Sequence, residues 1–142
     1  MDEERRRARD EEIVAMLRAE WPDLMAVYLF GSAAKGLERP GSDLDIAALG
    51  RSVPGKSTPA LTRRLGLAMA LKLGVDVDLV DLGVASTILQ KEVIAEGRRL
   101  WSADEFETEM FEIRVYSYYQ KLNEERADII ADGIRTGRFY HS

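Results

Sequence analysis

Two aspartates separated by one residue, Asp43 and Asp45, open an alternating segment of the chain. Residues two apart in a β-strand point to the same face, and Leu44 and Ile46 are suited to burying the opposite face. Two carboxylates that lie close together repel each other and raise each other's pKa unless a cation lies between them. Mg²⁺ is the natural occupant where phosphates supply further oxygen ligands. The alternative is an ordinary solvated strand end preceded by a turn.

A third carboxylate is available in the segment Val75–Leu82, which alternates between apolar residues and aspartate. An acidic side chain inside an apolar strand is costly to bury without a partner. If this strand pairs beside the one that carries Asp43 and Asp45, its carboxylate completes a site with three acidic groups. We expect Asp78 to be that carboxylate because it lies deeper in the run, with Asp76 in reserve.

Gly31 and Ser32 directly follow an apolar run of strand length, Leu24–Phe30. A glycine at this point lets the backbone approach a ligand closely, and successive N–H groups at the start of a short helix favour phosphate. The Ser32 hydroxyl can add a hydrogen bond. Taken alone, a Gly-Ser pair after a strand is more often only a turn with a helix N-cap than a phosphate-binding site.

Basic residues near these motifs are Lys35, Arg39 and Lys56, and each is either a phosphate neighbour or a plain surface charge. The single histidine, His141, is next to the end of the chain, so we expect no histidine-based catalysis. The tyrosines near the C-terminus have the spacing of packing or interface residues, and we expect no base stacking from them. They are Tyr116, Tyr118, Tyr119 and Tyr140.

The elements that must position these residues alternate between helical and strand patterns, which predicts an α/β domain. Proline at 22 and glycines at 31, 74 and 97 are placed to end elements. The expected helices cover residues 4–20, a short piece from 33, 59–73, 85–96 and 103–132; the expected strands cover 24–30, 43–49, 75–82 and 98–101.

Two of these helices carry apolar residues on more than one side. In the helix from Pro59, we expect Leu67 and Leu71 to widen the apolar face. The last helix has an apolar pattern through Phe106, Met110 and Ile113, and its remaining apolar residues are spread around it. It can pack wholly on the sheet, or it can present Phe111, Tyr118 and Ile129 to another protein. Trp21 and Trp101 flank elements and are predicted to pack.

The composition of the chain argues against several classes of function. The chain has 142 residues, a formal net charge of −5 and no cysteine. This length suits one domain, and the acidic charge argues against a broad nucleic-acid-binding surface. Without cysteine there is neither a disulfide framework nor a thiolate site. No apolar run reaches the length of a membrane span and no secretory signal is present, so we expect a cytoplasmic protein without membrane or direct nucleic-acid contacts.

Taken together, Gly31-Ser32, ten residues, and then Asp43-Leu44-Asp45 resemble the signature of the nucleotidyltransferase superfamily related to DNA polymerase β. The likeness is closer to the minimal nucleotidyltransferases of prokaryotes, whose motif corresponds here to GSAAKG followed by SDLD and then by Val77-Asp78-Leu79-Val80. It covers residues 24–101 well. The long C-terminal helix is similar to that of the MntA-type antitoxins, which act with a HEPN-domain RNase toxin.

This resemblance implies a small mixed sheet flanked by helices, with a long C-terminal helix. It also implies that Asp43, Asp45 and Asp78 bind two Mg²⁺ ions and are catalytic, and that Gly31, Ser32 and Lys35 bind the phosphates of ATP. Lys35 departs from the arginine common at its position, so a phosphate contact survives without the bidentate geometry. AMP would pass to a tyrosine of the HEPN-domain toxin, with pyrophosphate released.

We expect residues 1–102 to form the nucleotidyltransferase domain and residues 103–142 a helical extension, packed on the same domain or on a partner. Two other functions stay open. One is adenylylation of a small molecule, for which the chain has little room beyond residue 103. The other is a non-catalytic antitoxin that acts by binding, although a pure binder has no physical reason to gather repelling carboxylates.

Overall fold

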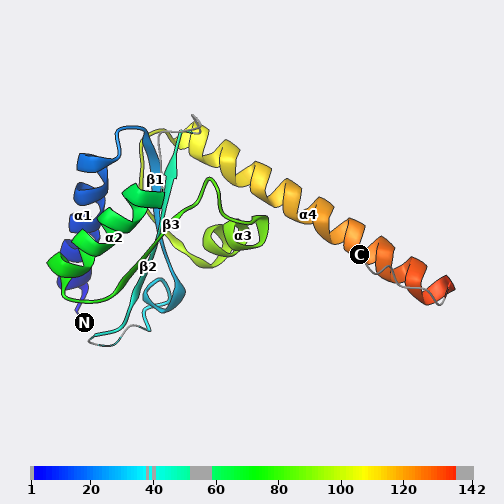
Figure 1. The fold of residues 1–142 in the computed structure, drawn as a ribbon, viewed down its shortest axis with the longest axis horizontal. Coiled ribbons are helices and arrows are strands. Elements are labelled where there is room, and N and C mark those ends of the chain that lie inside the picture. The colour runs from blue at the N-terminus through cyan, green and yellow to red at the C-terminus, as the bar shows by residue number, and fades with distance from the viewer. Residues whose placement is uncertain (1, 38, 40, 52–58, 137–142) are drawn as a thin grey trace.

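The computed structural model describes residues 2–37, 39, 41–51 and 59–136 of the chain. Helices and strands follow one another in the predicted order, and Figure 1 shows a small body from which the last helix extends far outward. The elements are α1 (Glu3–Glu20), β1 (Leu24–Phe30), the 3₁₀ turn η1 (Gly31–Ala33), β2 (Leu44–Gly50), α2 (Pro59–Leu73), β3 (Val77–Asp81), α3 (Thr87–Glu96), β4 (Arg98–Ser102) and α4 (Glu105–Thr136).

The four strands form one mixed sheet in the order β3-β2-β1-β4. β1 pairs antiparallel with both β2 and β4, whereas β2 and β3 run parallel. A parallel pair needs a crossover connection, and α2 supplies it between β2 and β3. The small mixed sheet flanked by helices and the long C-terminal helix, both expected from the resemblance, are therefore confirmed.

Helices cover both faces of the sheet, and strand alternation assigns each side chain to one face. Leu44, Ile46 and Ala48 of β2 pack in the core cluster formed with α1 and α2. Ala47 and Leu49 pack in a second cluster on the other face, which includes Val93 of α3 and Phe111 of α4. The Asp45 side chain, by this alternation, belongs to the face that α3 and α4 cover.

Local sequence explains where the site-bearing strand β1 begins and ends. Trp21 is 1% exposed at the end of α1, and Pro22 follows it before the chain turns into β1. Gly31, with a φ of +70°, ends the strand in a backbone conformation that favours glycine. The predicted packing role of Trp21 is confirmed, and Trp101 packs partly buried against the same cluster.

One expectation about a helix face was wrong. In α2 the core contains Leu65 and Met69, whereas Leu67 and Leu71 are 64% and 78% exposed. Leu67 is two positions from each core residue, which places its side chain on the opposite side of a helix with 3.6 residues per turn. Periodicity alone did not separate the two sides because both carry leucine.

In α4 the residues whose spacing predicted the helix, Phe106, Met110 and Ile113, are exposed. The side that packs on the body instead carries Val115, which is buried, and Phe111, which is partly buried against the second core cluster. The strand expected over 75–82 is also shorter, because β3 spans only Val77–Asp81. None of the helices in the described part of the chain is both long and apolar enough to cross a membrane.

Candidate active site

Asp45 lies at the point where three strands meet at one end of the sheet. Its register partner on β1 is Phe30, the last residue of that strand, and its partner on parallel β3 is Asp78. Val77 and Leu79 pack toward the cluster under α1 and α2, so Asp78 points to the opposite face, as Asp45 does. The predicted pairing of the two acidic strands therefore brings Asp45 and Asp78 side by side.

The neighbouring carboxylates change the pKa of Asp45. Its pKa is raised above the ordinary value, first by partial burial and then by the negative charges of Asp78 and Asp43. Both neighbours are themselves exposed at the sheet end. Three carboxylates thus influence one another at one position, the situation in which a bound cation is stabilised.

Asp78, rather than the reserve candidate Asp76, is the partner of Asp45. Asp76 precedes β3, and its carbonyl accepts a hydrogen bond of 2.9 Å from the backbone N–H of Leu44. Asp76 is absent from the charges that raise the pKa of Asp45. The backbone of Asp76 therefore fixes the start of β2, while the carboxylate of Asp78 faces the site.

Gly31 and Asp45 are in such close contact that any larger residue at position 31 would displace the Asp45 carboxylate. A β-carbon on Gly31 would overlap Oδ2 of Asp45 and would lie only 3.2 Å from its Cγ. The φ of +70° at Gly31 adds a second reason for glycine. The Gly-Ser motif and the first acidic motif, which ten residues separate in the chain, thus form one site.

The turn after Gly31 is organised around Ser32. Its carbonyl accepts hydrogen bonds from the N–H groups of Lys35 at 3.2 Å and Leu37 at 3.0 Å. The Ser32 side chain is exposed beside Gly31, where it can reach a ligand. Lys35 is exposed too, and among the described ion pairs none joins it to the three carboxylates. A role for Lys35 in binding phosphate stays a prediction.

Ser42 is a positioning residue in the turn that was expected before the strand. Its Oγ accepts a hydrogen bond of 2.8 Å from the Arg39 N–H, and its own N–H donates to the Arg39 carbonyl at 2.9 Å. This pair of bonds closes a turn directly before Asp43. The signal was available, since serine following Pro40 and Gly41 is typical of a turn that a side chain stabilises.

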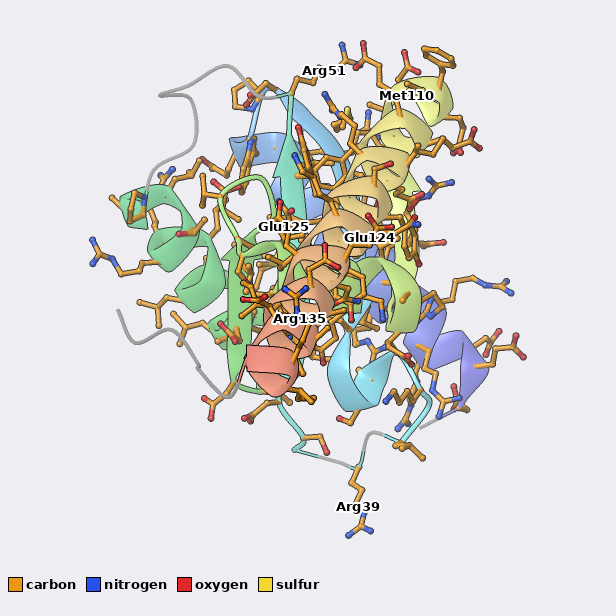
Figure 2. The ribbon with its side chains drawn as sticks, turned by 90° about the vertical axis from the view of Figure 1, so that its right-hand side faces the viewer. Arg39, Arg51, Met110, Glu124, Glu125 and Arg135 are labelled. Atoms are coloured by element: carbon orange, nitrogen blue, oxygen red, sulfur yellow. The ribbon has the colours of Figure 1, made fainter. Side chains whose placement is uncertain are left out.

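The other basic candidates do not reach the carboxylates in the described structure. The Arg39 side chain extends away from the body, as Figure 2 shows. Lys56 lies outside the described residues, and so do Tyr140 and His141. Tyr116 and Tyr118 are 43% and 62% exposed on α4, where they have the interface spacing expected of them.

The donor set suits Mg²⁺ that is shared with a triphosphate. Among the described residues, no three His, Cys, Asp or Glu side chains converge into a ready-made metal cluster. A closed cluster is not required, because Mg²⁺ is commonly held by one or two carboxylates plus substrate phosphates and water. Asp43, Asp45 and Asp78 offer such carboxylates close together: after partial burial, the charges of Asp78 and Asp43 raise the pKa of Asp45, and a cation would neutralise those charges.

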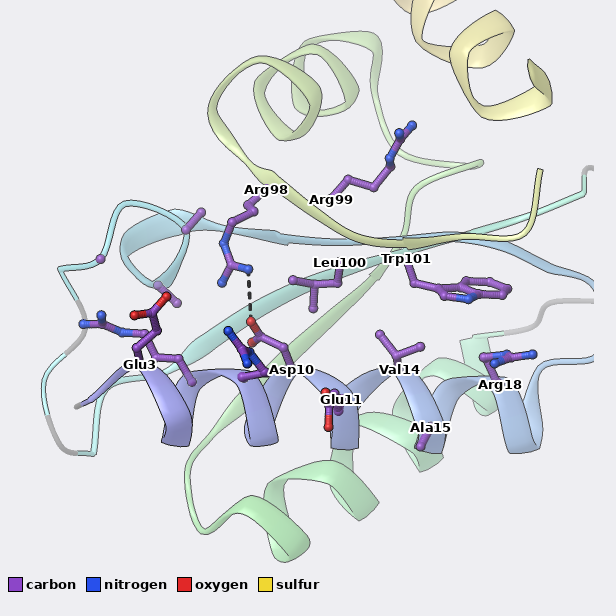
Figure 3. Close-up of a pocket in the computed structure, with 15 residues that line it drawn as sticks. Glu3, Asp10, Glu11, Val14, Ala15, Arg18, Arg98, Arg99, Leu100 and Trp101 are labelled. Carbon is purple, nitrogen blue, oxygen red and sulfur yellow. Dashed lines mark ion pairs between the residues drawn. The ribbon is translucent and has the colours of Figure 1, made fainter. Parts of the chain in front are cut away.

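A hollow of about 720 Å³ between α1 and β4 is not part of this site. It lies on the face of the sheet that α1 covers, away from the side to which Asp45 points. Figure 3 shows two of its charged groups already engaged: Arg98 pairs with Asp10 at 3.0 Å, and Arg18 lies over the Trp101 ring at 4.8 Å. Its contacts stabilise α1 on the edge strand.

Known proteins resemble this chain in both sequence and structure. Residues 11–106 match the family model described as polymerase beta, nucleotidyltransferase. The protein adenylyltransferase MntA of Shewanella oneidensis is 38% identical over 124 residues, which is 87% of this chain and 86% of that protein.

Solved structures agree with the sequence matches. A toxin–antitoxin crystal structure with AMP-PNP is 37% identical, covers 88% of this chain and 98% of its own, and has a TM-score of 0.77. A tri-AMPylated Shewanella oneidensis HEPN toxin in complex with an MNT antitoxin gives a match of 34% identity that covers 91% of this chain and 98% of its own, with a TM-score of 0.74. A structure described as a minimal nucleotidyltransferase is 34% identical, with a TM-score of 0.55, and covers 69% of this chain but 95% of its own.

The family match spans the Gly-Ser turn, both acidic strands and every strand of the sheet that holds them. The chain therefore belongs to the polymerase beta nucleotidyltransferase family, as the spacing of its glycine, serine and aspartates indicated.

Proposed function

We propose that this protein is a Mg²⁺-dependent adenylyltransferase that moves AMP from ATP to a tyrosine of a HEPN-domain toxin, releases pyrophosphate and thereby acts as an antitoxin. The observation that carries the proposal is the contact of the Asp45 carboxylate with Gly31, with Asp78 in register beside it. Support for the acceptor comes from the relative named protein adenylyltransferase and from the related complex that contains an AMPylated HEPN toxin.

Nucleotidyl transfer depends on charge neutralisation and in-line placement more than on covalent help from the protein. Two Mg²⁺ ions, when bound, would supply the positive charge for the attacking and leaving oxygens. Asp43 and Asp45 would hold both ions, and Asp78 would hold the one nearer the acceptor. Backbone N–H groups at the Gly31-Ser32 turn would orient the triphosphate, with Lys35 as a further cationic neighbour.

The transfer forms one phosphorus–oxygen bond and breaks another. The phenolic oxygen of the acceptor forms a bond to the α-phosphorus of ATP, and the bond between that phosphorus and the bridging oxygen of pyrophosphate breaks. The phenolic proton passes to the Asp78 carboxylate, which is exposed and next to Asp45. A cytoplasmic location suits a reaction that uses ATP and a toxin that cleaves RNA.

The direct test combines the purified protein, Mg²⁺ and a cognate HEPN-domain toxin with ATP labelled on either the α- or the γ-phosphate. We expect α-label, and no γ-label, on the toxin, together with a mass increase of one or more AMP units. Replacing the modified toxin tyrosine with phenylalanine should abolish labelling. A stable complex without label would instead support an antitoxin that acts by binding alone.

A matched pair of variants tests the roles of the carboxylates. Asp78→Asn removes the group in register with Asp45, whereas Asp76→Asn changes an exposed aspartate two positions away and leaves its backbone hydrogen bond to Leu44 in place. We expect a loss of transfer of at least about 100-fold for Asp78→Asn and near-normal transfer for Asp76→Asn. The reverse order would refute the assignment of Asp78.

A further inference from the structure

The last helix is far longer than the body needs. α4 has 32 residues, which corresponds to about 48 Å at 1.5 Å per residue. Its first half packs on the domain, where Thr108 and Val115 are buried. Figure 1 shows the second half leaving the body. α4 packs chiefly against α3.

The apolar row that packs on the body continues after the body ends. Every third or fourth residue on one side of α4 follows the sequence Phe111, Val115, Tyr119, Leu122, and the next apolar residues on that side are Ile129 and Ile130. Those two isoleucines are 52% and 48% exposed. Arg126 falls between them and Leu122, and its aliphatic stem can cover an apolar surface.

The opposite side of the same segment is acidic. Glu124 and Asp128 lie on that side, whereas Glu125 and Asp132 are four and three positions from Ile129 and border the apolar row. Figure 2 shows Glu124 and Glu125 on α4 with Arg135 further along it. A helix that only extends into solvent is expected to be polar all round. The end of α4 is instead two-sided, which indicates that its apolar side is covered by another protein surface.

Similarity to known structures identifies what covers it. The family match ends at residue 106, just inside α4. The structure described as a minimal nucleotidyltransferase covers a share of this chain no larger than the part that precedes α4, although 95% of its own length is matched. The toxin–antitoxin complexes cover 88% and 91% of this chain, so their matches must include much of α4. The long helix thus accompanies the toxin rather than the catalytic domain.

A second copy of this chain is a poor occupant of the same surface. α4 carries eight acidic and four basic residues, and the whole chain has a net charge of −5. Packing two such helices together brings like charges into proximity, which is unfavourable. A toxin that binds RNA, by contrast, carries basic surface that complements an acidic helix.

We propose that the apolar row at the end of α4, centred on Ile129 and Ile130, is a docking arm for the HEPN-domain toxin. The row lies on the side of α4 that packs against α3, the side of the sheet to which Asp45 points. A toxin held there is on the same side of the sheet as the Asp45 carboxylate. This inference rests on the proposed function for the identity of the partner.

The experiment uses the full chain with Ile129→Asp and Ile130→Asp together, and measures binding of the purified HEPN-domain toxin by calorimetry without ATP. Two half-exposed isoleucines that become fully buried predict an affinity about 30- to 100-fold weaker in the variant. Ile113→Asp is the matched control, because Ile113 is 57% exposed on the opposite side of the same helix. We expect the control to change the affinity by less than about threefold.

The thermal unfolding midpoint and the affinity for AMP-PNP with Mg²⁺ should stay at wild-type values in both variants, which shows that the domain and its site are intact. Unchanged toxin affinity in the double variant overturns the docking arm, and so does an equal loss in Ile113→Asp. Self-association of the wild-type chain that the double variant abolishes also overturns it, because the occupant is then a second copy.

Failure of the docking arm and failure of the proposed function give different results. If the wild-type chain binds the toxin tightly and the double variant does not, the arm stands even when no AMP is transferred. If AMP is transferred and both variants bind the toxin as the wild type does, the proposed function stands and the arm is refuted.

Discussion

Replacing Gly31 with alanine tests the most unusual contact of the site. The new methyl group would overlap Oδ2 of Asp45, and the residue would retain a φ of +70°. Gly36 provides the matched control, because its φ is +69° and no atom lies within 4 Å of an added β-carbon. Both substitutions therefore carry the same backbone strain, and only Gly31→Ala displaces a carboxylate.

The expected magnitudes follow from these two differences. A left-handed backbone costs an alanine about 1–2 kcal/mol, which is the whole expected loss in unfolding free energy for Gly36→Ala. Gly31→Ala adds about 0.5–1.5 kcal/mol for moving Asp45 off its preferred rotamer. A shift of about 1 Å in a catalytic group can lower the rate about 100-fold, so transfer should fall by that factor in Gly31→Ala alone.

Urea unfolding and AMP transfer to the toxin measure the two effects. A third variant, Gly31→Ala combined with Asp45→Ala, isolates the overlap, because the carboxylate is then absent. Relative to Asp45→Ala, the added alanine should cost only what Gly36→Ala costs. Equal unfolding free energies and equal transfer rates for Gly31→Ala and Gly36→Ala would refute the contact between Gly31 and Asp45.

Three further predictions concern single side chains. The raised pKa of Asp45 means that the folded state keeps a proton that the unfolded state already releases. Between the ordinary carboxyl pKa and the raised one, the contribution of Asp45 to stability therefore falls as pH rises. Without Mg²⁺, Asp45→Asn should flatten this dependence in urea unfolding at a series of pH values and should be at least as stable as wild type at neutral pH. Tyr28→Phe removes a partly buried hydrogen bond of 3.0 Å to Glu112 and should cost about 0.5–1.5 kcal/mol of unfolding free energy. An unchanged denaturation midpoint would contradict the importance of this link between β1 and α4. Leu17→Ala empties a position that is 0% exposed and should cost about 2–5 kcal/mol in the same assay, with a loss below about 1 kcal/mol arguing against the packing of α1 on the sheet.

Much of the fold was predictable because prolines and glycines mark the ends of its helices and strands clearly. The bounds of β1 agree with the prediction at both ends, since Pro22 and Gly31 bracket an apolar run. The shared face of Asp43 and Asp45 was predictable for a related reason. Leu44 and Ile46 are buried in the core, which leaves the aspartates only one direction.

What was not predictable depends on contacts between distant segments. Alternation places Asp76 and Asp78 on one face equally well, and only the register of β3 with β2 selects Asp78. The overlap between Gly31 and Asp45 likewise arises where β1 ends beside β2. In α4, apolar residues on several sides hid which side meets the body, because a partner surface and a core surface have the same composition.

The measurement that tests the central claim most directly is the rate of AMP transfer from α-labelled ATP to the toxin by wild type and by Asp45→Asn, each with Mg²⁺ and with EDTA. The site described here predicts transfer only by wild type with Mg²⁺, and a rate at least about 100-fold lower for Asp45→Asn at an unfolding midpoint no lower than that of wild type. Transfer by Asp45→Asn within about threefold of wild type, or wild-type transfer that persists in EDTA, would contradict it.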